Sequence, residues 1–225
     1  MHRCNVIDII NEGNIKHIVL NKPHNFSYIP GQFVMIKIND DIPKRAFSLS
    51  SSPSEKNLMI TVKLNNEGIF TPYIFNKLKI NDEIIIEGAY GKMSFDKFKE
   101  KEKSISLICA GTGVAPMRSI FKFILDNKLN NEVDIYYVTK TFENILYKKD
   151  FDLLNKNSIN NEQNFNVNIL LSQEKKENYF YGRIDKEKIK LDKDIYFICG
   201  PKDFVIEITK FLKEKNIKDI RIEAW

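Results

Sequence analysis

The amino-acid sequence predicts two domains, an antiparallel β-barrel followed by an α/β domain whose parallel sheet carries helices on both faces. Residues 1–95 consist mostly of short β-branched runs with one helical pattern, which is typical of a small barrel. After the charged segment 96–104, buried-type strands alternate with helices, which is typical of a parallel sheet. We therefore expect domains at residues 1–97 and 105–225, joined by a linker at 98–104.

The first domain is expected to contain six strands and one helix. Apolar residues recur at helical spacing between Ile69 and Leu78, and Pro72 suits an early helical position. Residues 11–14 are expected to form a hairpin turn and residues 88–91 a glycine-bounded loop. The strands are expected at residues 6–10, 15–20, 32–38, 45–51, 58–64 and 82–88.

The second domain is expected to alternate strands and helices. Strands are expected at residues 105–110, 133–138, 165–171, 195–198 and 219–223. Helices are expected at residues 116–125, 142–154 and 204–215, with an Asn-rich loop at 155–164.

Composition excludes several classes of protein. A hydrophobic fraction of 43% supports a buried core, and the net charge of +5 is spread along the chain, unlike the clustered charge of nucleic-acid-binding proteins. Cys4, Cys109 and Cys199 show no CxxC spacing, and the three histidines show no ligand-like spacing, so we expect no disulfide, iron–sulfur or other metal site. No apolar h-region or membrane-spanning run is present, so we expect a cytoplasmic protein without membrane contact.

The segment Arg45–Ser51 combines a cation, a flat aromatic ring and several hydroxyls. The rigid donor fork of arginine suits phosphate oxygens. In a strand, Arg45 and Phe47 would share one face, while Ala46 and Ser48 share the other. The segment is therefore a candidate for holding a ligand with a phosphate and a planar ring, the alternative being an ordinary strand with a surface arginine.

Two glycine turns follow strands of the second domain. The segment Cys109–Pro116 ends one strand and opens a helix, whose N-terminus and glycines favour a pyrophosphate. Cys199-Gly200-Pro201 ends a later strand. Because ligands of parallel sheets lie at the carboxyl ends of the strands, both turns could face one crevice. Cys199 is equally compatible with a buried structural thiol.

Together with Gly68–Thr71 and Glu223–Trp225, these segments resemble the motifs of the ferredoxin–NADP reductase superfamily, in the family's order and over nearly all of the chain. The resemblance implies an FAD-binding barrel and an NAD(P)-binding domain, without an iron–sulfur domain. It implies that Arg45 binds the flavin pyrophosphate, Phe47 contacts the isoalloxazine and Ser48 lies near the flavin N5. Phe47 replaces the family's tyrosine, which keeps the ring and removes one hydrogen bond.

The resemblance also assigns roles to other residues. The catalytic residues that it implies are Ser48, Cys199, Glu223 and Trp225. The FAD-binding residues that it implies are Arg45, Ala46, Phe47, Ser48, Val62, Lys63, Gly68, Ile69, Phe70, Thr71, Thr112 and Trp225. The NAD(P)-binding residues that it implies are Gly111, Thr112, Gly113, Pro116, Ser172, Gln173, Cys199, Gly200 and Pro201. Trp225 would cover the flavin, the alternative being a core-filling side chain.

The choice of nicotinamide stays open. Gln173 stands where family members often carry an arginine for the 2′-phosphate of NADP, and no Asp or Glu at that position favours the ribose of NAD. Nearby Lys140, Lys175, Lys176 and Tyr181 are candidates to compensate.

The resemblance implies a flavin-dependent NAD(P)H oxidoreductase that passes electrons to a separate carrier such as ferredoxin or flavodoxin. A reductase of free flavin is a first alternative, which Arg45 and Gly68–Thr71 disfavour because they suit a retained dinucleotide. An electron-transfer subunit of a larger redox complex is a second alternative. The electron acceptor, the direction of electron flow and the oligomeric state stay open.

Overall fold

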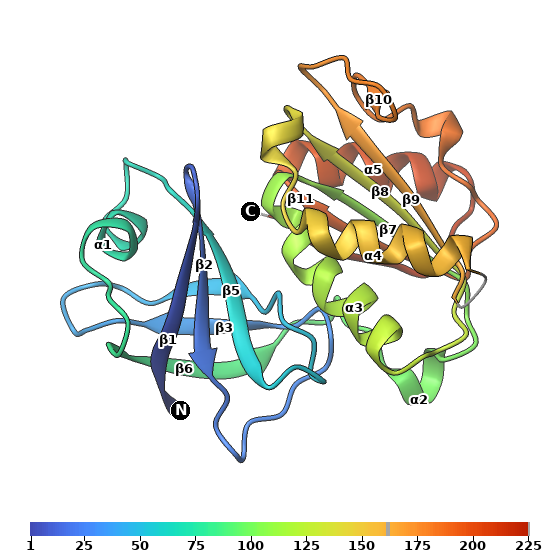
Figure 1. Ribbon diagram of the computed structural model, residues 1–225. Helices are drawn as coiled ribbons and strands as arrows, with labels where there is room; N and C mark the ends of the chain where they lie inside the picture. Colours follow the sequence, from blue (N-terminus) through green and yellow to red (C-terminus); the bar gives the residue numbers. More distant parts are fainter. Residues whose placement is uncertain (161–162, 225) are drawn as a thin grey trace.

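The computed structural model describes residues 1–160 and 163–224, which form two domains side by side (Figure 1). Each domain is built on a six-stranded sheet. The sheet of the first domain is antiparallel, and that of the second is parallel and carries helices. The fold class predicted from the sequence is therefore confirmed.

The strands of the first domain are ordered β4-β3-β6-β1-β2-β5. A bridge between Leu49 and Ile60 joins the end of β4 to β5 and closes the barrel. Alternate side chains of β5 point inward, so Ile60 is buried in the barrel core while Lys63 is exposed. Helix α1 (Phe70–Asn76) packs Phe70 into the same core. The strands are β1 (His2–Glu12), β2 (Ile15–Asn21), β3 (Phe33–Lys37), β4 (Arg45–Ser48), β5 (Asn57–Lys63) and β6 (Glu83–Tyr90).

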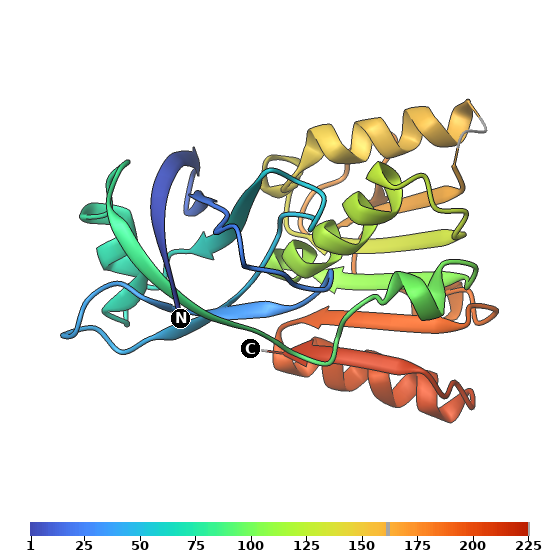
Figure 2. The same cartoon turned by 90° about the horizontal axis from the view of Figure 1, so that it is seen from below.

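The strands of the second domain are ordered β10-β9-β8-β7-β11-β12. Helices α3 (Val114–Asp126) and α4 (Lys148–Ile159) cover one face of the sheet, and α5 (Lys202–Glu214) covers the other (Figure 2). The carboxyl ends of the strands point toward the barrel (Figure 1). The strands are β7 (Ile105–Ala110), β8 (Val133–Thr139), β9 (Phe165–Leu171), β10 (Phe180–Tyr181), β11 (Ile195–Gly200) and β12 (Ile220–Ala224).

Two local predictions were wrong. The helix expected from residue 142 begins at Lys148, because residues 142–144 form a 3₁₀ turn and Tyr147 adopts a left-handed conformation with φ 56°. Helix α4 then runs to Ile159, through part of the expected loop. The loop expected at residues 88–91 is largely strand, since β6 continues to Tyr90 against β3.

The segment between the two sheets was expected to be a linker and contains the short helix α2 (Lys97–Glu100). The Glu100 side chain is buried and pairs with Arg221 of β12 at 2.7 Å. Arg221 also donates a hydrogen bond to the Ser94 carbonyl at 2.6 Å. This segment therefore holds the outer strand of the second sheet.

In the described parts of the chain, no helix has the length and apolar character needed to cross a membrane. The same residues contain no cluster of His, Cys, Asp and Glu side chains suited to a metal ion. Cys4, Cys109 and Cys199 are free and buried.

Candidate functional site

A cavity of about 460 Å³ lies between the barrel and the start of α3. Strand β4 supplies Phe47 and Ser48 to it, and the second domain supplies Thr112. The ring of Phe47 packs against that of Phe70, with centroids 5.4 Å apart. The lining residues are Ala46, Phe47, Ser48, Thr61, Lys63, Leu64, Asn65, Thr112 and Ala115. An aromatic ring, hydroxyls and a lysine in one cavity fit a planar ring carrying polar groups.

Arg45 is exposed at the start of β4, outside the lining of this cavity. It donates a hydrogen bond to the Lys44 carbonyl at 3.1 Å. Lys44 itself pairs with Glu87 at 2.6 Å. Among the described residues, no carboxylate pairs with the Arg45 guanidinium, so it suits an external anion.

The Gly68–Thr71 segment enters α1 beside this cavity. The Thr71 hydroxyl donates to the Asn65 carbonyl and accepts from the Asn65 amide, both at 2.9 Å. Thr71 therefore holds the loop that places Asn65 in the cavity wall. Val62 points into the barrel core instead of the cavity.

A second cavity, of about 300 Å³, lies at the carboxyl ends of β7 and β8. It shares Lys63 and Thr112 with the first cavity, so the two meet at these residues. The lining residues are Glu12, Asn14, Ile15, Lys63, Ala110, Gly111, Thr112, Tyr137, Val138, Thr139, Lys140, Glu143, Asn144, Leu146, Ser172 and Pro201. The backbone of Gly111 and Thr112, at the start of α3, fits a phosphate-bearing ligand. Two lysines add positive charge to the lining, and Glu12 and Glu143 add negative charge.

Two glycines shape the turn between β7 and α3 for different reasons. Gly111 has φ +55°, and a Cβ there would meet nothing within 4 Å, so its backbone is open to a ligand. At Gly113 a Cβ would lie 2.3 Å from the Cys199 carbonyl oxygen. Gly113 therefore allows α3 to begin directly against β11.

Cys199 and Glu223 are register partners on the neighbouring strands β11 and β12. Cys199 is completely buried and lines neither cavity, and burial raises the pKa of its thiol well above its ordinary value. Burial also raises the pKa of the Glu223 carboxyl to about 7. Glu223 can therefore carry or release a proton near neutral pH. Trp225 lies outside the described residues.

The remaining expected nicotinamide residues lie at the carboxyl ends of β9 and β11 and in α3. The Ser172 hydroxyl donates to the Thr139 carbonyl at 3.1 Å, and the Gln173 backbone N–H donates to the Lys140 carbonyl at 2.9 Å. The Lys175 ammonium lies 5.1 Å from the centre of the Tyr181 ring. Gly200 ends β11, Pro201 lines the second cavity and Pro116 is buried in α3.

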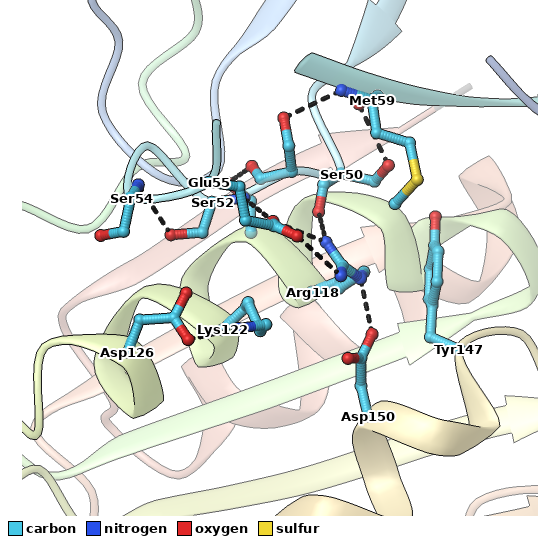
Figure 3. A network of polar contacts seen from close by, with 12 residues as sticks. Ser50, Ser52, Ser54, Glu55, Met59, Arg118, Lys122, Asp126, Tyr147 and Asp150 are labelled. Atoms are coloured by element: carbon cyan, nitrogen blue, oxygen red, sulfur yellow. Dashed lines mark hydrogen bonds and ion pairs between the residues drawn. The ribbon is translucent and has the colours of Figure 1, made fainter. Parts of the chain in front are cut away.

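Arg118 of α3 joins the two domains and was not singled out from the sequence (Figure 3). Its guanidinium donates to the Ser50 carbonyl at 2.7 Å, to Glu55 at 2.9 and 3.1 Å, and to Asp150 of α4 at 2.7 Å. Burial disfavours the charge of Arg118, but the two carboxylates outweigh it and hold its pKa above the ordinary value. The signal in the sequence that could have identified Arg118 is its position, a charged residue within the apolar stripe of a helix.

The Arg118 network lies next to the candidate site. Ser50 lies two residues after Ser48, the last residue of the β4 segment that lines the first cavity. The neighbouring Ser119 hydroxyl donates to the Ser51 carbonyl at 2.6 Å. Helix α3 therefore begins at the Gly111–Gly113 turn and, one turn later, fixes the barrel segment that carries Phe47 and Ser48.

Comparison with known families agrees with this division of the chain. The family model of the oxidoreductase FAD-binding domain matches residues 7–95, and that of the oxidoreductase NAD-binding domain matches residues 107–210. Most residues that line the first cavity lie in the segment that matches the FAD-binding domain. The lining of the second cavity includes residues from the segment that matches the NAD-binding domain.

Individual proteins are more distantly similar. A flavohemoprotein of Candida norvegensis is 26% identical over 203 residues, which are 88% of this chain and 49% of that protein. Sulfhydrogenase 2 subunit gamma of Pyrococcus furiosus is 26% identical over 214 residues, which are 88% of this chain and 71% of that protein. The chain spans about half the length of several curated relatives that it matches.

A crystal structure of a ferredoxin–NADP reductase from Neisseria gonorrhoeae with bound FAD and NADP has the same fold. The TM-score is 0.84 at 16% identity, covering 99% of this chain and 98% of that one.

Proposed function

This protein belongs to the ferredoxin–NADP reductase superfamily, and we propose that it is an FAD-dependent NAD(P)H reductase that serves a separate electron carrier. The observation that carries this proposal is the meeting of the two cavities at Lys63 and Thr112. A flavin ring in the first cavity and a nicotinamide in the second would lie against each other there. Holding two reactants in contact is the main contribution that such a site makes to hydride transfer.

In this proposal, the barrel holds the flavin. Phe47 and Ser48 bind the ring system, Lys63 stands between the two cofactors and Arg45 binds the pyrophosphate. Bound FAD supplies the acceptor of a hydride and can release electrons one at a time. Ser48 and Glu223 tune the protonation of the site, and buried Cys199 supports the nicotinamide from behind the Gly111–Gly113 turn.

The second domain holds the nicotinamide dinucleotide. The backbone of Gly111 to Gly113 receives the pyrophosphate, and Thr112 lies between the two rings. Ser172 and Gln173 bind the adenosine end, where Lys140 and Lys175 favour a phosphate group by charge. The domain boundaries inferred from the sequence, 1–97 and 105–225, are part of this proposal.

We propose ferredoxin or flavodoxin as the separate carrier. Both are acidic proteins, and the excess of basic over acidic residues here gives a net charge of +5, which attracts an acidic partner weakly. A cytoplasmic location remains a prediction from the sequence.

A second candidate is an electron-transfer subunit of a larger redox complex. It is favoured by the similarity to sulfhydrogenase 2 subunit gamma, a protein named as one subunit of an assembly. Both candidates share the hydride step and differ in the partner that receives the electrons.

The spectrum of the purified protein tests the proposal. We expect retained FAD, bleached anaerobically by NADPH or NADH and re-oxidised by added ferredoxin or flavodoxin. A colourless protein that reduces added riboflavin would instead indicate a reductase of free flavin. Flavin that is bleached by nicotinamide but not re-oxidised by either carrier would favour the subunit of a larger complex.

A further inference from the structure

A row of polar side chains connects the flavin-side cavity to a larger cavity, which adjoins the nicotinamide-side cavity at Glu12. His17 of β2 and Thr61 of β5 are register partners on the outer face of the barrel, with His17 Nδ1 2.8 Å from Thr61 Oγ1. On the other side, His17 Nε2 lies 3.3 Å from Glu12 of β1. Thr61 also hydrogen-bonds the Tyr147 hydroxyl. Four side chains from both domains thus form one chain of hydrogen-bonding groups.

The two ends of this chain face different spaces. Thr61 lines the cavity of about 460 Å³ that also holds Phe47 and Ser48. His17, Glu12 and Tyr147 line a cavity of about 990 Å³ between the β1–β2 hairpin and the start of α4, and Glu12 also lines the nicotinamide-side cavity. The His17–Thr61 pair therefore connects the large cavity with the flavin site, although His17 itself is buried.

Proton transfer along this row requires one tautomer of His17. Thr61 Oγ1 lies within hydrogen-bond distance of the Tyr147 hydroxyl, of Ser50 Oγ and of His17 Nδ1. When the Tyr147 hydroxyl donates to Thr61, Thr61 can donate to an unprotonated His17 Nδ1, which leaves the ring proton on Nε2, directed at Glu12. A proton can then pass from Thr61 through the imidazole to Glu12.

The charges around His17 favour its neutral form. Burial lowers the pKa of His17, Glu12 raises it, and Arg118 lowers it again. The ring of Tyr147 packs beside the imidazole at 5.0 Å. A neutral imidazole is the form that can accept a proton on one nitrogen and release another from the opposite nitrogen.

We propose that Thr61, His17 and Glu12 form a proton path that links the flavin site to the large interdomain cavity. The path rests on the proposed function, because that reaction must release a proton. A hydride brings one hydrogen nucleus and two electrons from NAD(P)H. When both electrons leave for a one-electron carrier, the nucleus remains as a proton, so the net change is NAD(P)H to NAD(P)⁺, H⁺ and two electrons.

The proton enters the path at Thr61 Oγ, which receives it from the flavin site and passes its own proton to His17 Nδ1. His17 Nε2 then releases a proton to Glu12, whose carboxylate lies at the wall of the open cavity. Glu12 releases this proton into the cavity. The Thr61 hydroxyl and the imidazole ring then reorient, so that Thr61 again donates to an unprotonated ring nitrogen and the protonated ring nitrogen again faces Glu12. No residue along the path is consumed.

The first test reads the tautomer without any turnover. Nitrogen-15 NMR of the FAD-loaded, oxidised protein at pH 7 should show His17 with Nδ1 unprotonated and Nε2 protonated. The variant His17→Gln identifies the resonance, and exposed His24 serves as a reference. A His17 that is protonated at Nδ1, or doubly protonated at pH 7, would overturn the path.

The second test separates proton release from hydride transfer. FAD-loaded protein is first bleached with NADPH or NADH and then re-oxidised by ferricyanide, in H₂O and D₂O. In His17→Gln and Thr61→Val we expect re-oxidation to slow about 10- to 100-fold, in the lower range of what a positioned acid–base group contributes, with a larger solvent isotope effect. Bleaching of His17→Gln should match wild type. His24→Gln is the matched control and should behave as wild type throughout.

Imidazole rescue separates a proton path from a merely structural role. In His17→Ala, added imidazole can enter through the large cavity, and we expect it to restore re-oxidation toward the wild-type rate. Slow re-oxidation without rescue or isotope effect, or unchanged re-oxidation with normal bleaching, would overturn the proton path alone. Wild-type protein that nicotinamide does not bleach would overturn the proposed function and the path together.

Discussion

Replacing Arg118 with methionine should destabilise the protein by about 2–4 kcal/mol. The change removes four hydrogen bonds and leaves Glu55 and Asp150 as unpaired carboxylates at the domain interface. Removing one partner of a buried ion pair costs about 3–5 kcal/mol. The side chain of Arg118 is 8% exposed, but those of Glu55 and Asp150 are 28% and 20% exposed, so water partly compensates the two carboxylates and lowers the expected cost.

Thermal and urea unfolding of the Arg118→Met protein measure this cost. For a chain of this size, about 2–4 kcal/mol corresponds to a fall in Tm of about 4–16 °C. Lys122→Met is the matched control, because Lys122 pairs with Asp126 within the same helix and should cost only about 0.5 kcal/mol. Adding Glu55→Gln and Asp150→Asn to Arg118→Met should restore part of the stability. A loss no greater than that of Lys122→Met would refute the role of Arg118 between the domains.

Three further outcomes are expected. Burial raises the pKa of Glu223 to about 7, so the folded protein holds this proton more tightly than the unfolded chain does. In urea titrations, the stability of wild type relative to Glu223→Gln should therefore fall as the pH rises from about 5 to 7 and then level off. A stability difference that does not vary with pH would contradict this prediction. Gly113→Ala should lower the free energy of unfolding by about 1–3 kcal/mol or more, because the new Cβ would overpack against the Cys199 carbonyl. Gly111→Ala should lower it by only about 1–2 kcal/mol, the cost of a left-handed backbone for alanine. Equal unfolding free energies for the two variants would count against the close approach of Gly113 to Cys199. Gln173→Arg should raise the preference for NADPH over NADH by about 10- to 100-fold, since a hydrogen bond to a charged group contributes about 1.5–3 kcal/mol; unchanged kcat/KM ratios for the two nicotinamides would place the 2′-phosphate elsewhere.

Much of the fold could be predicted from the sequence because its signals are local. Alternating residues such as Ile60 and Thr61 reveal the two faces of a strand, and the glycines before α3 mark a turn into a helix. Membership in the superfamily followed from several short motifs in one order, and the matches over residues 7–95 and 107–210 confirm it.

The parts that the sequence did not reveal depend on contacts between distant segments. Arg118 becomes an interdomain link only because the fold brings Glu55 and Asp150 to it. His17 showed no ligand-like spacing, and its pairing with Thr61 is set by the register of β2 and β5. Tyr147, the residue before α4, likewise contacts Thr61 across the domain interface.

The central claim is that the two cavities hold a flavin and a nicotinamide in contact at Lys63 and Thr112. Anaerobic stopped-flow reduction of the FAD-loaded protein by nicotinamide deuterated at C4 tests it most directly. The expected result is bleaching of the flavin in a single encounter, slower with the deuterated than with the ordinary nicotinamide, because the hydride passes directly between the rings. Absence of bleaching by both NADPH and NADH would contradict the claim.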